Sequence, residues 1–194
     1  EQYRNIFFSP GISLTSDKLT VLDTASDSLK KQAGTVTDLT FDYGLSYDNR
    51  NRSFMPTNGY LSSFSQALPI LADASALKNI YSLSAYKEVS EDLIGAFKFY
   101  AATINGIDED VRLSKRLKVP SRRLRGFESG KIGPKDGGDF VGGNYASAVN
   151  LEANLPNLFP EATKVDVGFF LDFGNVWGVD YDSSLNETNT IRSS

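Results

Sequence analysis

Residues 36–47 read Val36-Thr-Asp-Leu-Thr-Phe-Asp-Tyr-Gly-Leu-Ser-Tyr47. The odd positions are mostly apolar or aromatic, whereas the even positions after Val36 are polar or small and include Asp38 and Asp42. Side chains of a β-strand point alternately to opposite faces, so this period of two predicts a strand with one apolar and one polar face. Such a strand must lie between an apolar and a polar environment, and this requirement limits the fold classes that the chain can adopt.

The same alternation returns along the rest of the chain. Residues 147–155 and 164–174 again place apolar side chains on the odd positions and mostly polar or small ones on the even positions. Less regular alternation at 60–69, 79–89 and 92–104 predicts three more strands. The chain is therefore predicted to be all-β, with its strands in an antiparallel sheet.

The composition excludes several kinds of protein. The 194 residues include no cysteine and no histidine, which excludes disulfides, thiolate nucleophiles and Ser/His triads. No run of about 18 apolar residues is present, which excludes a transmembrane helix but not a membrane β-barrel, whose strands are apolar only at alternate positions. The net charge of −4 argues against nucleic acid as a partner. No metal or cofactor is expected.

The lengths of strands and connections favour a membrane barrel. Many predicted strands have about ten residues, close to the ~9–11 that a tilted strand needs to cross a bilayer and more than the ~5–6 usual in soluble sheets. The connections at 48–58 and 156–163 are short, whereas those at 15–35, 105–145 and beyond 175 are long. Outer-membrane barrels have short turns on one side and long loops on the other. A soluble β-sandwich also alternates and stays open as the alternative.

The first long connection carries helix signals. Ser16 or Asp17 is a candidate N-cap, a stripe of leucine and alanine follows, and Gly34 is a candidate end. We therefore expect a short helix in an extracellular loop, lying over the mouth of a barrel.

Two other segments make local predictions. In the connection at 48–58, Asn58 and Gly59 are expected to supply the positive φ values of a turn. At the other end of the chain, Ile191-Arg-Ser-Ser194 is expected to begin a further strand.

The connection at 105–145 holds the most distinctive residues of the chain. Arg125, Gly126 and Phe127, here called the tip motif, place a permanent cation, a flexible glycine and an aromatic ring side by side in a glycine-rich segment. Because arginine keeps its proton, burying it requires an anionic or carbonyl partner. Glu152 and Asp172 lie on the polar parity of their strands, and Phe170 shares that face and is able to stack on a guanidinium. The alternative is that both carboxylates only line a watery lumen.

Four segments in order, 41–60, 124–134, 142–144 and 169–177, resemble the carboxy-terminal barrel of the BamA-type outer-membrane assembly factors, the bacterial surface antigen family. The loop residues that carry this resemblance are Arg125, Gly126, Phe127, Gly133, Pro134, Gly142, Gly143 and Asn144. The resemblance implies that residues 1–194 are part of a C-terminal barrel domain, about eight strands of a sixteen-stranded barrel. It also implies that the loop folds back into the lumen as the sixth extracellular loop, with wall carboxylates corresponding to Glu152 and Asp172 as partners of Arg125.

The resemblance further implies a function without catalysis. A protein of this family inserts and folds β-barrel proteins in the bacterial outer membrane, so its expected partners are unfolded outer-membrane proteins, outer-membrane lipid and the lipoproteins of an assembly complex. Arg125 is then a structural latch. Three alternatives stay open: a two-partner-type secretion pore of the same superfamily, a passive porin, and a barrel hydrolase, for which a histidine-free chain lacks the usual base.

Overall fold

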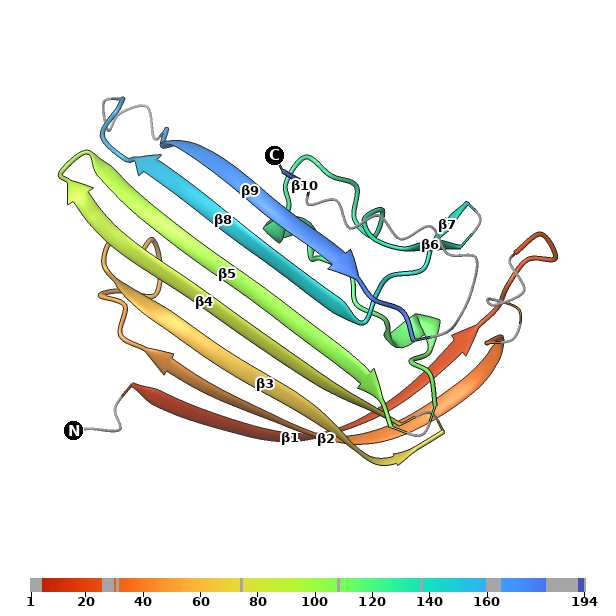
Figure 1. The fold of residues 1–194 in the computed structure, drawn as a ribbon. Coiled ribbons are helices and arrows are strands. Elements are labelled where there is room, and N and C mark those ends of the chain that lie inside the picture. Colours follow the sequence, from red (N-terminus) through yellow and green to blue (C-terminus); the bar gives the residue numbers. More distant parts are fainter. Residues whose placement is uncertain are drawn as a thin grey trace.

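The computed structural model describes residues 5–25, 30, 32–73, 75–107, 109–136, 138–159, 165–180 and 192–193. Its main feature is a curved antiparallel sheet of eight strands that follow one another in chain order (Figure 1). These strands are β1 (Ile6–Leu19), β2 (Gly34–Asp48), β3 (Gly59–Ala72), β4 (Ala76–Ser90), β5 (Leu93–Gly106), β8 (Tyr145–Leu155), β9 (Val167–Trp177) and β10 (Arg192–Ser193).

The connection between β5 and β8 contains the remaining elements. They are two 3₁₀ turns, η1 (Leu113–Lys115) and η2 (Ser121–Arg123), and a small hairpin of β6 (Lys135–Asp136) and β7 (Asp139–Phe140). Figure 1 shows this connection on the inner side of the curved sheet. No stretch of helix long and apolar enough to span a membrane occurs among the described residues.

The strand register gives the sheet an inner and an outer face. Asp38 and Asp172 lie on the inner face and are only 5% and 0% exposed. On the outer face, Leu14 is paired with Leu39, and Ile12 and Leu14 are 71% and 73% exposed. A largely apolar exposed face of this kind is stable only against an apolar environment. The alternation in the sequence thus corresponds to two surroundings rather than to two halves of a soluble core.

The structure confirms the all-β antiparallel fold. The predicted strands coincide with β2, β3, β4, β5 and β8, and β9 covers 167–177 rather than 164–174. The β-sandwich alternative is wrong, because these strands form one sheet, and the only other sheet among the described residues is the small β6–β7 hairpin. The start of a strand expected at 191–194 is found as Arg192–Ser193, which pairs with β9; residues 191 and 194 lie outside the described part.

The predicted helix is wrong at its start, although Lys30, further along the predicted span, is helical. Residues 16–19, expected to begin the helix, are the end of β1 and pair with residues 34–37 of β2. Residues 20–25 contain a turn, and residues 26–29 and 31 lie outside the described part. The long antiparallel ladder with β2 gives these residues hydrogen-bond partners across the sheet, and this outweighs a local apolar stripe.

The core lies between the inner face and the loop. Leu117, Val119, Leu124 and Ile132 from the loop pack with wall residues that include three alanines. The wall residues of this cluster include Tyr100, Ala102, Ile104, Ala146, Ala148 and Val176. Alanines on the wall leave the space that the larger loop side chains fill, so the loop and sheet form one packed unit.

The turn between β2 and β3 is held by asparagine side chains. Asn51 Oδ1 accepts hydrogen bonds from the backbone N–H groups of Thr57 and Asn58, and Asn49 Oδ1 accepts one from Tyr60. Gly59 has a φ of 92°, as predicted, but the second positive φ belongs to Met55 and not to Asn58. Asn58 instead donates its backbone N–H to Asn51, and this bond makes it part of the closed turn.

Gly59 tests how much this turn contributes to stability. A Cβ at Gly59 would lie 2.4 Å from the backbone oxygen of Asn49, whereas one at Gly138 would meet nothing within 4 Å. We expect Gly59→Ala to reduce the free energy of unfolding of the full-length protein in detergent by about 1–3 kcal/mol. Gly138→Ala should change it by less than about 0.5 kcal/mol. Equal losses in urea titrations of the two variants would contradict this account.

Candidate functional site

The site begins where the loop leaves and re-enters the wall. Leu117 and Gly143 exchange two backbone hydrogen bonds, of 2.7 and 3.1 Å, which close the loop at its base. Next to them, Ile104 of β5 donates to the oxygen of Asn144, and the Asn144 N–H donates to the oxygen of Gly178. The predicted residues Gly142, Gly143 and Asn144 therefore lie at the junction of the loop with β5, β8 and the end of β9.

Gly133 and Pro134 lie where the loop passes closest to β9. A Cβ at Gly133 would be 2.8 Å from the Cβ of Val176, and the backbone there has a φ of 103°. Pro134 is fully buried, and its oxygen accepts a hydrogen bond from Val141. Only glycine allows the loop backbone to approach the wall at this point.

The tip motif contacts the wall through Arg125. Its Nε donates to Asp172 Oδ2 at 2.7 Å and its Nη2 donates to Asp172 Oδ1 at 2.6 Å. The backbone N–H of Arg125 also donates to Asp172 Oδ2, at 3.0 Å. Asp172 on β9 is 0% exposed. One buried carboxylate thus accepts three hydrogen bonds from a single loop residue, a strong bidentate pair with a backbone bond added.

Glu152 and Phe170 complete the surroundings of Arg125. The guanidinium Nη2 is 3.0 Å from Glu152 Oε1, and the guanidinium carbon is 3.8 Å from the centroid of the Phe170 ring. Glu152 also accepts a 2.5 Å hydrogen bond from Lys98 Nζ, so two cations share this carboxylate. The structure therefore brings Arg125, Glu152, Phe170 and Asp172 into direct contact.

The other two residues of the tip motif lie beside this contact. Gly126 has a positive φ, and Phe127 packs against the core cluster between loop and wall. The Phe127 ring thereby connects the ion pair to the apolar packing of the loop.

The charges around η2 affect one another. The hydrogen bonds and charge of Asp172, helped by Glu152, raise the pKa of Arg125 above its ordinary value, although burial opposes this. Burial, with the neighbouring charge of Arg122, lowers the pKa of Arg123. Arg123 lies over the Tyr100 ring at 5.7 Å rather than against a carboxylate. Arg125 is thus the cation whose charge the site stabilises most directly.

This arrangement is suited to holding a loop. The described residues contain no group of three or more acidic, histidine or cysteine side chains placed to hold a metal ion. The carboxylates at the tip are satisfied by arginine, lysine and amide donors. What the geometry provides is a strong, directional attachment between the loop and strands β8 and β9.

Comparison with known sequences gives the family. Residues 4–194, nearly the whole chain, match the Omp85 superfamily domain. The chain belongs to the Omp85 superfamily.

Several relatives of this chain carry names that state a function. The human Sorting and assembly machinery component 50 homolog is 27% identical over 81% of this chain, and the outer membrane protein assembly factor BamA of Neorickettsia risticii is 26% identical over 95%. A SAM50-like protein of Schizosaccharomyces pombe is 31% identical over 87%. The present chain spans only 36%, 26% and 37% of the lengths of these three proteins.

A solved structure supports the same fold. The crystal structure of BamA from Haemophilus ducreyi lacking POTRA domains 1–3 superposes with a TM-score of 0.79 and 22% identity. The match covers 90% of this chain and 39% of the BamA chain. The eight-stranded sheet therefore has the fold of a part of that BamA structure.

Sequence reasoning missed Asn150, which this Omp85 site also contains. Asn150 on β8 is 1% exposed, and its Nδ2 donates to Asp172 Oδ1 at 2.7 Å and to the backbone oxygen of Arg123 at 2.8 Å. It thus joins the wall carboxylate to the loop two residues before Arg125. Asn150 lies two residues before Glu152, so both side chains point to the same inner face of β8, and this spacing could have identified it.

Two further ion pairs hold the loop nearer its base. Lys115 Nζ is 2.7 Å from Asp38 Oδ2 on β2, and Arg116 Nη2 is 2.8 Å from Asp180 Oδ1 beyond β9. Sequence reasoning did not pair them, because 77 residues separate Lys115 from Asp38 and no periodicity relates them. The loop is therefore attached to β2 as well as to β8 and β9.

A double-mutant cycle measures which carboxylate matters more to Arg125. We expect Arg125→Ala and Asp172→Ala to show a coupling free energy of about 2–3 kcal/mol in urea unfolding of the full-length protein. Coupling between Arg125→Ala and Glu152→Ala should be smaller, because Lys98 still pairs with Glu152. A larger coupling with Glu152 would reverse the assignment.

Asn150 is tested separately from the ion pair. Asn150→Leu removes one donor to Asp172 and leaves the Arg123 oxygen without its partner, so we expect a loss of about 1–3 kcal/mol in the free energy of unfolding. Asn154→Ala, an exposed position on the same strand and face, serves as the matched control and should change little. Similar losses in both variants would show that Asn150 has no special role.

Proposed function

We propose that this chain is part of the membrane barrel of a bacterial outer-membrane protein assembly factor, a protein that inserts and folds other β-barrel proteins. The support comes from relatives whose names describe assembly factors and assembly-machinery components. The apolar outer face, with side chains such as Leu14 and Ile12 more than two thirds exposed, fits a location within the outer membrane. Residues 1–194 then belong to the C-terminal barrel domain of a longer protein.

The physical task of such a protein is to lower a kinetic barrier. Each unpaired backbone N–H or C=O group of an incoming strand costs several kcal/mol in hydrocarbon, so strands do not enter a bilayer singly at a useful rate. A barrel already in the membrane helps by offering a place where strands pair as they enter. This requires no bond to be made or broken, and we assign no enzymatic activity.

The loop attachment is the observation that carries the proposal for these residues. A latch formed by Arg125, Gly126 and Phe127 keeps the loop against β8 and β9, where Asp172 and Glu152 accept its charge. The loop thereby stabilises the inner wall while other parts of the barrel act on a substrate. Gly133, Gly142 and Gly143 support this attachment by letting the loop backbone approach the wall. The backbone hydrogen bonds of Pro134 and Asn144 also support it.

The proposed partners follow from the same function. They are unfolded outer-membrane proteins as substrates, outer-membrane lipid around the barrel, and lipoproteins of an assembly complex. A secretion pore of the same superfamily and a passive porin are less well supported, because both need a path through the lumen, and here Leu124 and Val119 of the loop are buried against the wall. A barrel hydrolase is disfavoured by the absence of histidine from all 194 residues.

An assembly assay tests the proposal. Full-length protein, together with its assembly partners, is reconstituted in lipid vesicles and the folding yield of an added unfolded β-barrel protein is measured. We expect Arg125→Ala to reduce this yield about tenfold and to make residues 126–144 sensitive to protease, because Asp172 loses its main partner. Arg125→Lys should recover only part of the yield, since lysine lacks the planar fork of arginine.

Lys131→Ala is the matched control for this assay. Lys131 lies in the same loop, its side chain is 57% exposed, and its ion pair is with Glu128, three residues away in the same loop. Its substitution should leave both yield and protease resistance unchanged. An Arg125→Ala protein with normal yield and normal protease resistance would exclude the latch, and a wild-type protein that exports a partner polypeptide without folding barrels would instead identify a secretion pore.

A further inference from the structure

The outer face of β2, β3, β4 and β5 carries a continuous chain of side-chain hydrogen bonds. Tyr43 Oη donates to Gln66 Oε1 at 3.0 Å, and Gln66 Nε2 donates to Asn79 Oδ1 at 2.5 Å. Asn79 Nδ2 then donates to Thr103 Oγ1 at 3.2 Å. The register places each of these residues directly opposite the next. One row of polar side chains therefore connects four neighbouring strands.

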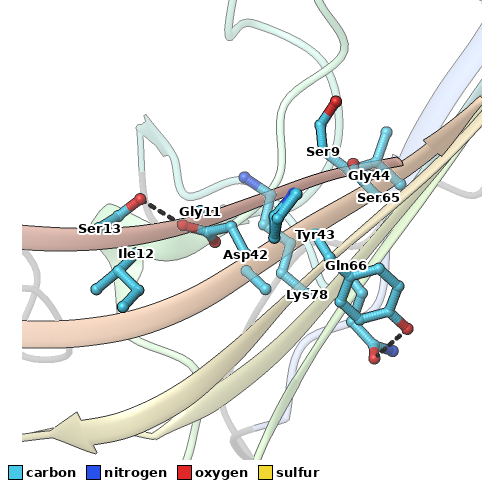
Figure 2. A pocket seen from close by; sticks show the side chains of 13 residues that line it. Ser9, Gly11, Ile12, Ser13, Asp42, Tyr43, Gly44, Ser65, Gln66 and Lys78 are labelled. Atoms are coloured by element: carbon cyan, nitrogen blue, oxygen red, sulfur yellow. Dashed lines mark hydrogen bonds between the residues drawn. The ribbon is translucent and has the colours of Figure 1, made fainter. Parts of the chain in front are cut away.

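This row lies on the apolar side of the sheet. Figure 2 shows the Tyr43 and Gln66 side chains on the opposite side of the strands from Ser9. The Tyr43 ring centroid is 6.3 Å from each of the ring centroids of Phe8, Phe41 and Phe64. The tyrosine hydroxyl and its glutamine partner are therefore set among aromatic side chains rather than in the polar interior.

The neighbours along each strand are also apolar. On the outer face of β3, Gln66 lies between Phe64 and Leu68, and on β4, Asn79 lies between Leu77 and Tyr81. The four members of the row are all half-buried. A primary amide in such surroundings has no water nearby to replace a lost protein partner, so its hydrogen bonds count for more than they would in water.

We propose that Tyr43, Gln66, Asn79 and Thr103 form a lipid-facing clasp that holds β2 to β5 together. Each amide has its oxygen and its nitrogen bonded to neighbours in the row, which satisfies groups that hydrocarbon would leave unpaired. The clasp rests on the proposed location in a membrane. It is separate from the loop latch, which lies on the inner face and attaches to β8 and β9.

The clasp predicts a specific pattern of stabilities. We take the full-length protein in phosphatidylcholine vesicles and measure the folded fraction in urea by heat-modifiable gel mobility. Gln66→Leu leaves Asn79 Oδ1 without its donor, and Asn79→Leu leaves Gln66 Nε2 without its acceptor, so each should lower the ratio of folded to unfolded protein about tenfold. The triple variant Tyr43→Phe/Gln66→Leu/Asn79→Leu removes the unpaired groups together and should be more stable than either single variant. If the ratio of folded to unfolded protein in the triple variant falls by the product of the factors measured for the single variants, the clasp is overturned.

An inner-face pair on the same strands provides the control. Ser63 and Ser82, on β3 and β4, have hydroxyl oxygens 2.8 Å apart on the face opposite the row. Ser63→Ala and Ser82→Ala should each change the ratio less than about threefold and combine additively, because water replaces their bond. A coupling as large as that of Gln66 and Asn79 would mean that the lipid-facing position has no special effect, and would overturn the proposal.

A milder pair of variants covers the case in which the leucine variants do not fold. Tyr43→Phe removes only the hydroxyl that donates to Gln66, whereas Tyr47→Phe alters a tyrosine of the same strand and face that packs on Tyr60 at 5.5 Å. We expect the ratio of folded to unfolded protein to be at least threefold lower in Tyr43→Phe than in Tyr47→Phe. Equal effects overturn the clasp. If the wild-type protein does not enter the vesicles, the membrane location itself is overturned. If it enters them but the stability losses of the variants are additive, only the clasp is overturned.

Discussion

The rest of the structure depends on the need to pair one buried carboxylate. Asp172 is 0% exposed in the middle of β9, and an unpaired charge at such a position costs several kcal/mol. Arg125 meets that charge with a bidentate contact and a backbone hydrogen bond, and it comes from a loop that starts at the far end of β5. The wall is therefore complete only when the loop is folded back against it.

The pairing has consequences for the whole inner face. Because the loop must reach Asp172, its apolar residues Leu117, Val119 and Leu124 are brought onto the inner wall, where Ala102, Ala146 and Ala148 leave room for them and they are buried. Glu152 and Asn150 then add contacts on β8, and Asp38 adds one on β2 through Lys115. The loop thus connects strands that are not neighbours in the sheet. This explains why an ion pair and a packed core occur together on an inner face that would be exposed to solvent without the loop.

The two faces of the sheet pair their water-excluded polar side chains in different ways. On the inner face, Asp38, Glu152 and Asp172 are paired with cations carried by the loop. On the outer face, exposed apolar side chains predominate, and the polar Gln66 and Asn79 are bonded to each other rather than to charges. In both places these side chains have at least one polar partner, which lowers the cost of keeping them away from water.

The sequence by itself determined the strands, their two faces and the parity of Glu152, Phe170 and Asp172, because the side-chain period of two is a local property of each strand. It also identified the tip motif, because a permanent cation in a glycine-rich loop requires a partner. Only the tertiary structure decided that residues 16–19 extend β1 instead of starting a helix, since pairing with β2 outweighs local propensity. Likewise, it decided which polar groups meet, such as Asn150 with Asp172 and Gln66 with Asn79, because register and loop path bring together residues that no local pattern relates.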